Sequence, residues 1–124
     1  MAMGGAKFDM ISIYRWKAVD STDLQQMLFL LGPLSVTIDG INALEYDGKG
    51  PHFANCSSEE SDSNFSALLV GYGTDSFGDY WLLKFNQGPR FGDHGYAKLV
   101  RGSDQNTCGV FNLPLGIKLD VHTE

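Results

Sequence analysis

Three histidines and a neighbouring carboxylate are the residues of this chain whose chemistry could hold a metal ion. They are His52, His94 and His122, with Asp93 next to the second of them. A protein metal site needs several such ligands on one framework, at spacings set by a helix or a hairpin. The spacing here gathers them on neither, so we expect surface histidines and no metal centre. A chain of this length can also bury a hydrophobic core, so we expect no cofactor to be needed for stability.

One glycine-rich segment could be compared with a nucleotide-binding loop. Gly71-Tyr72-Gly73 begins like the dinucleotide fingerprint, in which glycines let the backbone approach a pyrophosphate at the start of a helix. The third glycine of that pattern is replaced by Ser76, and the residues that follow lead into a strand-like run. We therefore expect no nucleotide site in this segment.

Four apolar residues at helical spacing predict one short helix near residues 22–31. They are Leu24, Met27, Leu28 and Leu31. Capping oxygens precede them at residues 20–22, and a glycine and a proline follow at residues 32–33 as end signals. These residues give the helix one apolar face, which must pack on the rest of the domain.

Short runs of β-type residues, separated by glycines, make up most of the remaining chain. They cover residues 11–19, 34–38, 67–72, 80–85, 96–100 and 117–121. Their length and spacing predict an α+β fold, mainly antiparallel β, with a partly closed β-barrel. Residues 40–62 lack periodicity and are expected to form a surface excursion. Residues 1–10 are assigned to an N-terminal extension that need not be ordered, and residues 11–124 to one domain.

Composition excludes two classes of partner. Among 124 residues, nine Lys or Arg stand against fifteen Asp or Glu, which gives a net charge of −6. Such a surface repels phosphate backbones, so nucleic acid is not an expected partner. The longest strongly apolar stretch, residues 27–31, is far shorter than the roughly 18 residues that a membrane span requires. We expect no membrane insertion, and residues 1–10 lack a signal-peptide pattern.

A series of short motifs after residue 31 resembles the papain-like cysteine proteases. Residues 32–39 read GPLSVTID, which is similar to the family's GPxSVxID segment. Further motifs follow in the family's order: CSSE at 56–59, LLVGYG at 68–73, YWLLK at 80–84, GY at 95–96 and CGV at 108–110. Cathepsin L-like and cathepsin O-like enzymes carry similar residues in these places. The resemblance implies the C-terminal, right-hand domain of such an enzyme, and it places the catalytic Cys and the oxyanion-hole Gln in a left-hand domain outside this chain.

The right-hand domain of this family supplies a His, which forms an ion pair with the thiolate, and an Asn, which orients that His. Counted back from the GYG motif, the His position falls on Phe65. Counted on from YWLLK, the Asn position falls on Phe85 and the position of a shielding Trp on Gln87. A phenylalanine has no proton to give, so the resemblance implies a degenerate, inactive homologue.

No neighbouring residue restores the missing groups. The sequence between His52 and His94 contains no other His, so a shifted alignment does not recover a base. Asn86 would have no imidazole to orient, and a one-residue shift on a strand points it to the opposite face. Ser66 cannot act as a general base near neutral pH.

The two cysteines, Cys56 and Cys108, lie outside the family's catalytic Cys context and match positions that form a disulfide in cathepsin L-like right-hand domains. The resemblance therefore implies this pairing and an oxidising compartment: secretory, endolysosomal or extracellular. Asn55-Cys56-Ser57 and Asn64-Phe65-Ser66 are also acceptor triplets for N-glycosylation. We leave open whether either Asn55 or Asn64 carries a glycan.

The resemblance implies a non-catalytic protease homologue that works as a binding or structural subunit. Two alternatives stay open: a light-chain-like subunit that completes the substrate cleft of a two-chain cathepsin-like protease, and a regulator of such a protease. Phe65 and Phe85 either fill the space left by a lost active site or anchor a protein partner. The partner would be a left-hand papain-like domain, another subunit or a second copy of this chain.

Overall fold

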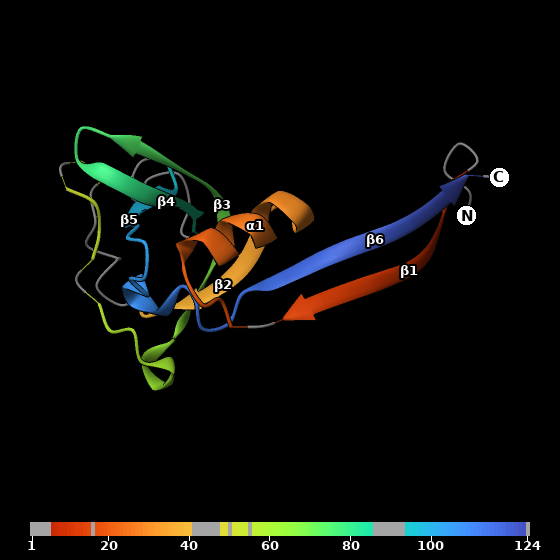
Figure 1. The fold of residues 1–124 in the computed structure, drawn as a ribbon, viewed down its shortest axis with the longest axis horizontal. Helices are drawn as coiled ribbons and strands as arrows, with labels where there is room; N and C mark the ends of the chain where they lie inside the picture. The colour runs from red at the N-terminus through yellow and green to blue at the C-terminus, as the bar shows by residue number, and fades with distance from the viewer. Residues whose placement is uncertain are drawn as a thin grey trace.

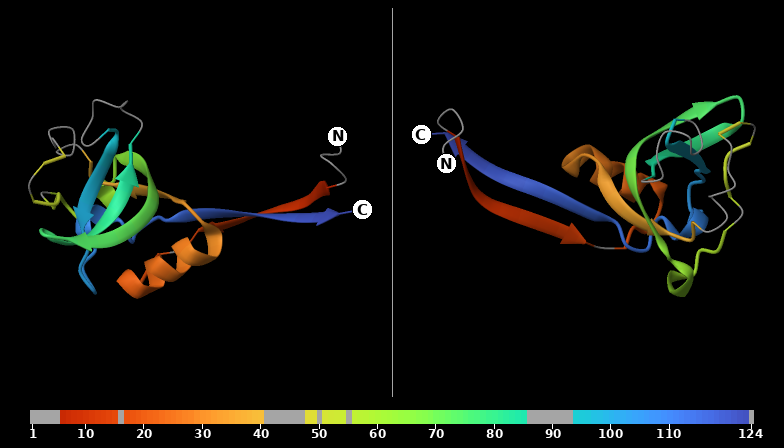
Figure 2. Two further views of the ribbon diagram at one scale, coloured as in Figure 1. Left: turned by 90° about the horizontal axis from the view of Figure 1, so that it is seen from above. Right: turned by 180° about the vertical axis from the view of Figure 1, so that it is seen from behind.

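A six-stranded antiparallel sheet and one α-helix make up the described part of the chain (Figure 1). The computed structural model describes residues 6–15, 17–40, 48–49, 51–54, 56–85 and 94–123. Its elements are β1 (Ala6–Arg15), α1 (Ser21–Leu31), β2 (Leu34–Ile38), η2 (Glu60–Asp62), β3 (Phe65–Asp75), β4 (Gly78–Lys84), β5 (Tyr96–Val100), η3 (Thr107–Gly109) and β6 (Leu115–Thr123), where η marks a 3-10 helix. The strands lie in the order β1-β6-β2-β3-β4-β5. The predicted fold class is confirmed: the sheet curls without closing, with β1 and β5 at its edges (Figure 2).

The predicted helix is confirmed as α1. It begins after Asp20, whose carboxylate caps it by accepting a hydrogen bond from the backbone N–H of Asp23 at 2.8 Å. It ends at Gly32, whose φ of 79° suits a residue without Cβ. Leu24 and Met27 are buried against the sheet, as their spacing predicts. Within the described residues, no helix is both long enough and apolar enough to cross a membrane.

The core lies between α1 and the inner face of the curled sheet. Side chains that alternate along the strands fill it, because successive residues of a strand point to opposite faces. On β2, Leu34, Val36 and Ile38 are fully buried, while the residues between them are half-buried. Trp81 of β4 and Leu99 of β5 are also buried. The bounds predicted for β2 and β5 agree with the structure, whereas β3 and β6 are longer than predicted.

Strands β1 and β6 form a long two-stranded ribbon that projects from the body of the domain (Figures 1 and 2). Ala6 pairs with Thr123 at its far end, and Arg15 pairs with Leu115 at its base. The strand predicted at residues 11–19 therefore lies earlier, at Ala6–Arg15, and residues 17–19 follow it without strand structure. The division of the chain at residue 10 stays a prediction, although β1 runs across that point.

The segment that was expected to be a surface excursion, residues 40–62, is anchored where it is described. Phe53 forms a parallel bridge with Leu99, and its backbone exchanges hydrogen bonds of 2.9 and 3.0 Å with Lys98 and Val100. Main-chain pairing with the edge strand β5 thus holds residues 51–54 against the sheet. This pairing buries His52, which corrects the expectation that all three histidines lie on the surface.

Candidate functional site

Phe65 and Phe85 come together at one end of the β3–β4 pair. Phe65 is the first residue of β3, and Phe85 follows the last residue of β4. Because these strands are antiparallel neighbours, the start of one lies beside the end of the other. The two ring centroids are 6.3 Å apart at an interplanar angle of 52°. The two residues that the resemblance assigns to the catalytic His and Asn positions are therefore in ring contact.

Both phenylalanines are held by the surrounding chain. Phe85 is 5% exposed, and its backbone N–H donates to the carbonyl of Gly95 at 3.0 Å. Phe65 is half-buried and packs against the backbone of Gly40. A Cβ built on Gly40 would lie 2.6 Å from the Phe65 ring, so only glycine fits there without moving the ring. Phe85 consequently offers little surface to a partner, and Phe65 is the more accessible of the two.

A shallow hollow of about 370 Å³ lies beside this pair. We call it the β3 hollow; it is lined by Ser35, Ser66, Ala67, Leu68, Lys84 and Phe85. Leu68 is 39% exposed on its wall, and the Lys84 ammonium lies 5.8 Å from the centre of the Tyr96 ring. The ring of Phe85 cannot take up or release a proton. The hydroxyls of Ser35 and Ser66 have no imidazole beside them among the residues that line the hollow. The β3 hollow can therefore offer apolar contact and hydrogen bonds, whereas cysteine protease chemistry requires an imidazole.

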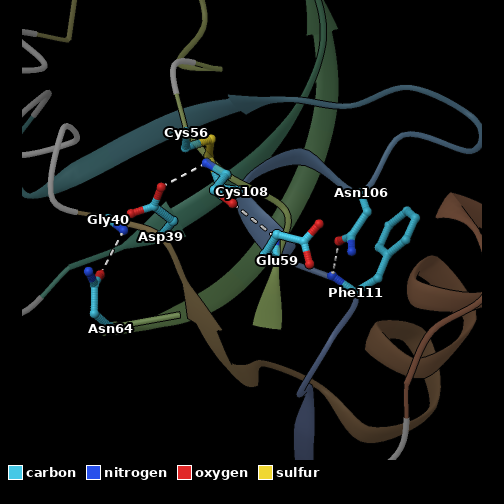
Figure 3. Close-up of a disulfide and its surroundings, with 9 residues drawn as sticks. Asp39, Gly40, Cys56, Glu59, Asn64, Asn106, Cys108 and Phe111 are labelled. Carbon is cyan, nitrogen blue, oxygen red and sulfur yellow. Dashed lines mark hydrogen bonds between the residues drawn. A yellow bond between two sulfur atoms is a disulfide. The ribbon is translucent and has the colours of Figure 1, made fainter. Parts of the chain in front are cut away.

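The disulfide between Cys56 and Cys108 fastens the loop that precedes β3 (Figure 3). Cys108 is 1% exposed and lies in η3, and its carbonyl accepts a hydrogen bond of 2.9 Å from the backbone of Asp39. The Asp39 carboxylate in turn accepts from the backbone N–H of Ser57 at 2.7 Å. The pairing implied by the resemblance is present in the structure, and it joins η3 to the segment that leads to Phe65.

The acceptor triplet at Asn64 lies on the surface next to this loop. Asn64 is exposed, and its Oδ1 accepts from the backbone N–H of Gly40 at 3.2 Å (Figure 3). Ser66, the third residue of the triplet, is exposed as well. The other candidate positions, Asn55 and Gln87, lie outside the described residues.

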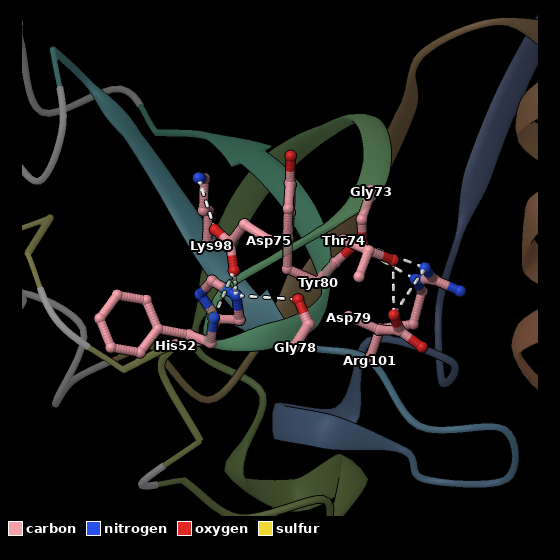
Figure 4. Close-up of polar contacts among 10 residues, drawn as sticks. His52, Gly73, Thr74, Asp75, Gly78, Asp79, Tyr80, Lys98 and Arg101 are labelled. Carbon is pink, nitrogen blue, oxygen red and sulfur yellow. Dashed lines mark hydrogen bonds and ion pairs between the residues drawn. The ribbon is translucent and has the colours of Figure 1, made fainter.

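A cluster of polar side chains lies at the opposite end of β3 from Phe65 (Figure 4). His52 Nε2 lies 2.8 Å from the Asp75 carboxylate and 3.3 Å from the carbonyl of Gly78, and the His52 side chain is 2% exposed. Lys98 Nζ donates to the same carboxylate at 2.9 Å and lies 4.6 Å from the centre of the Tyr80 ring. Sequence reasoning missed this cluster, because its residues come from three separate segments with no shared motif.

The environment of Asp75 changes the pKa of its carboxyl group. Partial burial would raise that pKa, but hydrogen bonds from Lys98, from the Phe77 backbone and from His52 together outweigh it. The pKa of Asp75 is therefore lower than its ordinary value of 3.8. The carboxylate thus stays charged and binds two cationic or polar groups at once.

The glycine-rich segment at residues 71–73 lies inside β3 and not at the start of a helix. A Cβ on Gly73 would come within 2.7 Å of the Tyr80 hydroxyl, so this glycine permits close packing across the strand pair. The Gly73 carbonyl also accepts a hydrogen bond of 3.1 Å from Arg101, whose guanidinium lies 5.1 Å from the centre of the Tyr72 ring. These contacts assign the segment a packing role in the sheet.

Comparisons with known proteins agree with the motifs and the fold. A model of the family described as papain family cysteine protease matches residues 5–116. The chain is 40% identical over 93 residues to digestive cysteine proteinase 3 of Homarus americanus, covering 73% of this chain and 28% of that protein. It is 31% identical over 99 residues to the viral cathepsin of Spodoptera exigua nuclear polyhedrosis virus, covering 80% of this chain and 28% of that protein.

A solved structure has a similar fold. Digestive procathepsin L 3 from the larval midgut of Tenebrio molitor superimposes with a TM-score of 0.74 at 31% identity, over 87% of this chain and 35% of that one. The chain thus spans about 28% of the length of the curated relatives it matches. On these matches and on its fold, the chain belongs to the papain family of cysteine proteases, of which it represents part of one domain.

Proposed function

We propose that this chain is a catalytically inactive right-hand domain of the papain family that acts as a protein-binding or structural subunit. The observation that carries the proposal is the contact between Phe65 and Phe85. At the two places where the family needs a base and the group that orients it, this chain has two packed hydrocarbon rings. The proposal applies to this chain and to any longer protein of which it forms a part.

The size of the expected catalytic defect supports this proposal. In hydrolases with a nucleophile–His pair, removal of the His alone lowers kcat by roughly 10⁶-fold, and further losses add little because the groups act together. Phe65 by itself would therefore suffice to abolish proteolysis. The close fit of its ring against Gly40 also supports the proposal, because it leaves no space between this ring and the Gly40 backbone for a further side chain.

A chimera tests the catalytic part of the proposal, because the nucleophile belongs to the other domain. The matching segment of the Homarus digestive cysteine proteinase 3 would be replaced by this chain, and cleavage of a fluorogenic peptide would be measured. We expect kcat at least about 10⁴-fold below that of the parent enzyme. Circular dichroism and native mass would show that the chimera is folded. Peptide cleavage at the parental rate by the unmodified chimera would contradict the proposal.

A matched variant of the chimera separates lost chemistry from lost structure. It carries Phe65→His, Phe85→Asn and Gln87→Trp, which restore the three family positions. A gain of peptide cleavage in this variant would identify these positions as the cause of the defect. The unmodified chimera addresses the alternative of a subunit that completes a two-chain protease, because only that alternative lets the unmodified chain support cleavage beside a left-hand partner.

The binding part of the proposal rests on the β3 hollow and on apolar residues exposed near it. Leu68 and the accessible edge of Phe65 contribute apolar surface, and Lys84 adds a positive charge at the wall. Light scattering would first give the native mass of the purified chain, and mass spectrometry would identify co-purifying protein. We expect a stable complex that Leu68→Asp weakens. A monomer that captures no protein from its source would contradict a binding role.

A further inference from the structure

We propose that Asn64 is an N-glycosylation site and that its glycan lies at the rim of the β3 hollow. This inference goes beyond the proposed function, because it concerns a covalent modification and not catalysis. The acceptor triplet Asn64-Phe65-Ser66 has no proline in its middle position. Both of its outer residues, Asn64 and Ser66, are exposed. The folded chain therefore leaves space for an oligosaccharide at this position.

The hydrogen bonds of Asn64 leave its side-chain nitrogen available. The backbone N–H of Asn64 donates to the carbonyl of Ile38 at 2.9 Å, and Oδ1 accepts from the backbone of Gly40. Nδ2 has no hydrogen-bond partner among the described residues. Replacement of one Nδ2 hydrogen by a sugar consequently breaks none of these contacts, and the Gly40 hydrogen bond fixes the direction in which the glycan leaves the chain.

The disulfide supplies a second, independent observation. The bridge between Cys56 and the buried Cys108 forms in an oxidising compartment, and the secretory lumen, where N-glycans are attached, is such a compartment. The co-reactant is an oligosaccharide linked to a polyprenyl diphosphate. In the transfer, a bond forms between Nδ2 and the anomeric carbon of the first sugar, the sugar–phosphate bond breaks, Nδ2 loses a proton, and the lipid diphosphate leaves.

The position of the glycan follows from the strand geometry. Ser66 lines the β3 hollow, and Asn64 lies two residues before it, which is roughly 7 Å of extended chain. Gly40, which fixes the Asn64 amide, is the same residue that contacts the Phe65 ring. A glycan at Asn64 is therefore placed at the rim of the β3 hollow, on the side of Phe65 and Ser66.

The experiment uses the full chain behind a cleavable secretion leader, expressed in cultured animal cells and analysed by intact mass and glycopeptide mapping. We expect a mass increase that peptide-N-glycosidase removes, with the released site mapped to Asn64. Asn64→Gln and Ser66→Ala should each abolish the Asn64 glycopeptide, whereas Ser66→Thr should preserve it. Asn55→Gln is the matched control, because it removes the other triplet and leaves Asn64 intact.

An unmodified Asn64 peptide in secreted, disulfide-bonded protein would overturn the proposal, as would a glycan found at Asn55 alone. If secretion fails, translation in the presence of microsomes gives the same mass readout before folding is complete. Because the experiment measures glycan mass and not peptide cleavage, a failure of the glycosylation inference is distinguishable from a failure of the proposed function. An unglycosylated chain in an inactive chimera would reject only the present inference.

Discussion

The two ends of strand β3 carry opposite kinds of chemistry. At its start, Phe65 packs against Phe85 and Gly40, at the position that the resemblance assigns to a histidine. At its end, Asp75 binds a buried histidine, His52, together with Lys98 (Figure 4). The chain thus contains a His–Asp pair, but at the end of the strand far from the positions that the resemblance assigns to catalysis. The comparison shows that the place of a histidine in the fold, and not only its presence beside a carboxylate, decides what the histidine can do.

The polar end is closed to a substrate. Nδ1 of His52 is buried without a hydrogen-bond partner in the described part of the chain, and the rings of Phe77 and Tyr80 lie 5.9 and 5.1 Å from the imidazole. A general base must reach the proton that it removes. His52 has no accessible nitrogen for that purpose, so its contact with Asp75 serves to attach residues 51–54 to the β3–β4 turn.

The largest expected effect concerns the disulfide at the Phe65 end. The bridge closes a loop with a sequence separation of 52 residues. Replacing both cysteines by alanine should lower the free energy of unfolding by about 4 kcal/mol, because the unfolded chain regains the entropy of the open loop. Urea denaturation followed by fluorescence would measure this loss.

Reduction of the wild-type protein is the matched control for the double alanine variant. It should shift the urea midpoint by a similar amount, since both treatments open the same loop. Hydrogen exchange would then show whether opening is local. Equal loss of protection at residues 56–64 and at the Asp75 end would contradict the idea that the disulfide specifically holds the start of β3.

The next largest effect is the difference in stability lost when a buried phenylalanine near the start of β3 and an exposed one at its end are each replaced by alanine. Phe85→Ala removes a ring that is 5% exposed and should cost about 3 kcal/mol of unfolding free energy. Phe77→Ala, at the other end of β3, removes a ring that is 55% exposed and should cost less than about 1 kcal/mol. Thermal and urea unfolding of the two variants would test this. Equal losses would mean that Phe85 is not the packed residue that its burial indicates.

Part of the region around the start of β3 could be predicted from sequence, because it depends on local patterns. The runs of β-type residues at 34–38 and 96–100 predicted the bounds of β2 and β5, whereas the run predicted at 67–72 begins two residues after the first residue of β3. The resemblance, counted back from the GYG motif, singled out Phe65. The contact between Phe65 and Phe85 follows once β3 and β4 are paired. The close approach of the Phe65 ring to Gly40 could not be predicted, because nothing near Gly40 in the sequence indicates which ring will occupy the space beside it.

The polar end of β3 could not be predicted in this way. His52 was expected on the surface because its neighbours show no periodicity, and a pairing between Phe53 and the distant strand β5 is what buries it. Such a parallel bridge has no local signal. The contact of Asp75 with Lys98 likewise requires that β3, β4 and β5 be assembled first.

A smaller effect would establish whether His52 stabilises the fold. His52→Ala removes the contact with Asp75 and the packing against Tyr80, and it should cost about 2 kcal/mol of unfolding free energy. His94→Asn is the control, because His94 is exposed and asparagine tolerates its positive φ of 56°. The control should change stability by no more than about 0.5 kcal/mol. A His52 variant as stable as the control would remove the basis for a structural role.

The smallest effect is the pH dependence contributed by Asp75. The pKa of its carboxyl is lower in the folded chain than the ordinary value of 3.8, so the folded state binds fewer protons than the unfolded state as the pH falls. The stabilisation is therefore complete above about pH 5 and is lost as the pH falls through the folded pKa. Urea midpoints of the wild type should accordingly fall more steeply between about pH 5 and pH 3 than those of Asp75→Asn, which cannot titrate at this position. Other carboxylates titrate in both proteins, so only the difference between the two curves reports on Asp75. Parallel curves would mean that the negative charge of Asp75 adds no measurable stability, and the polar end of β3 would then be held by neutral hydrogen bonds and by packing, as the phenylalanine end is held by packing.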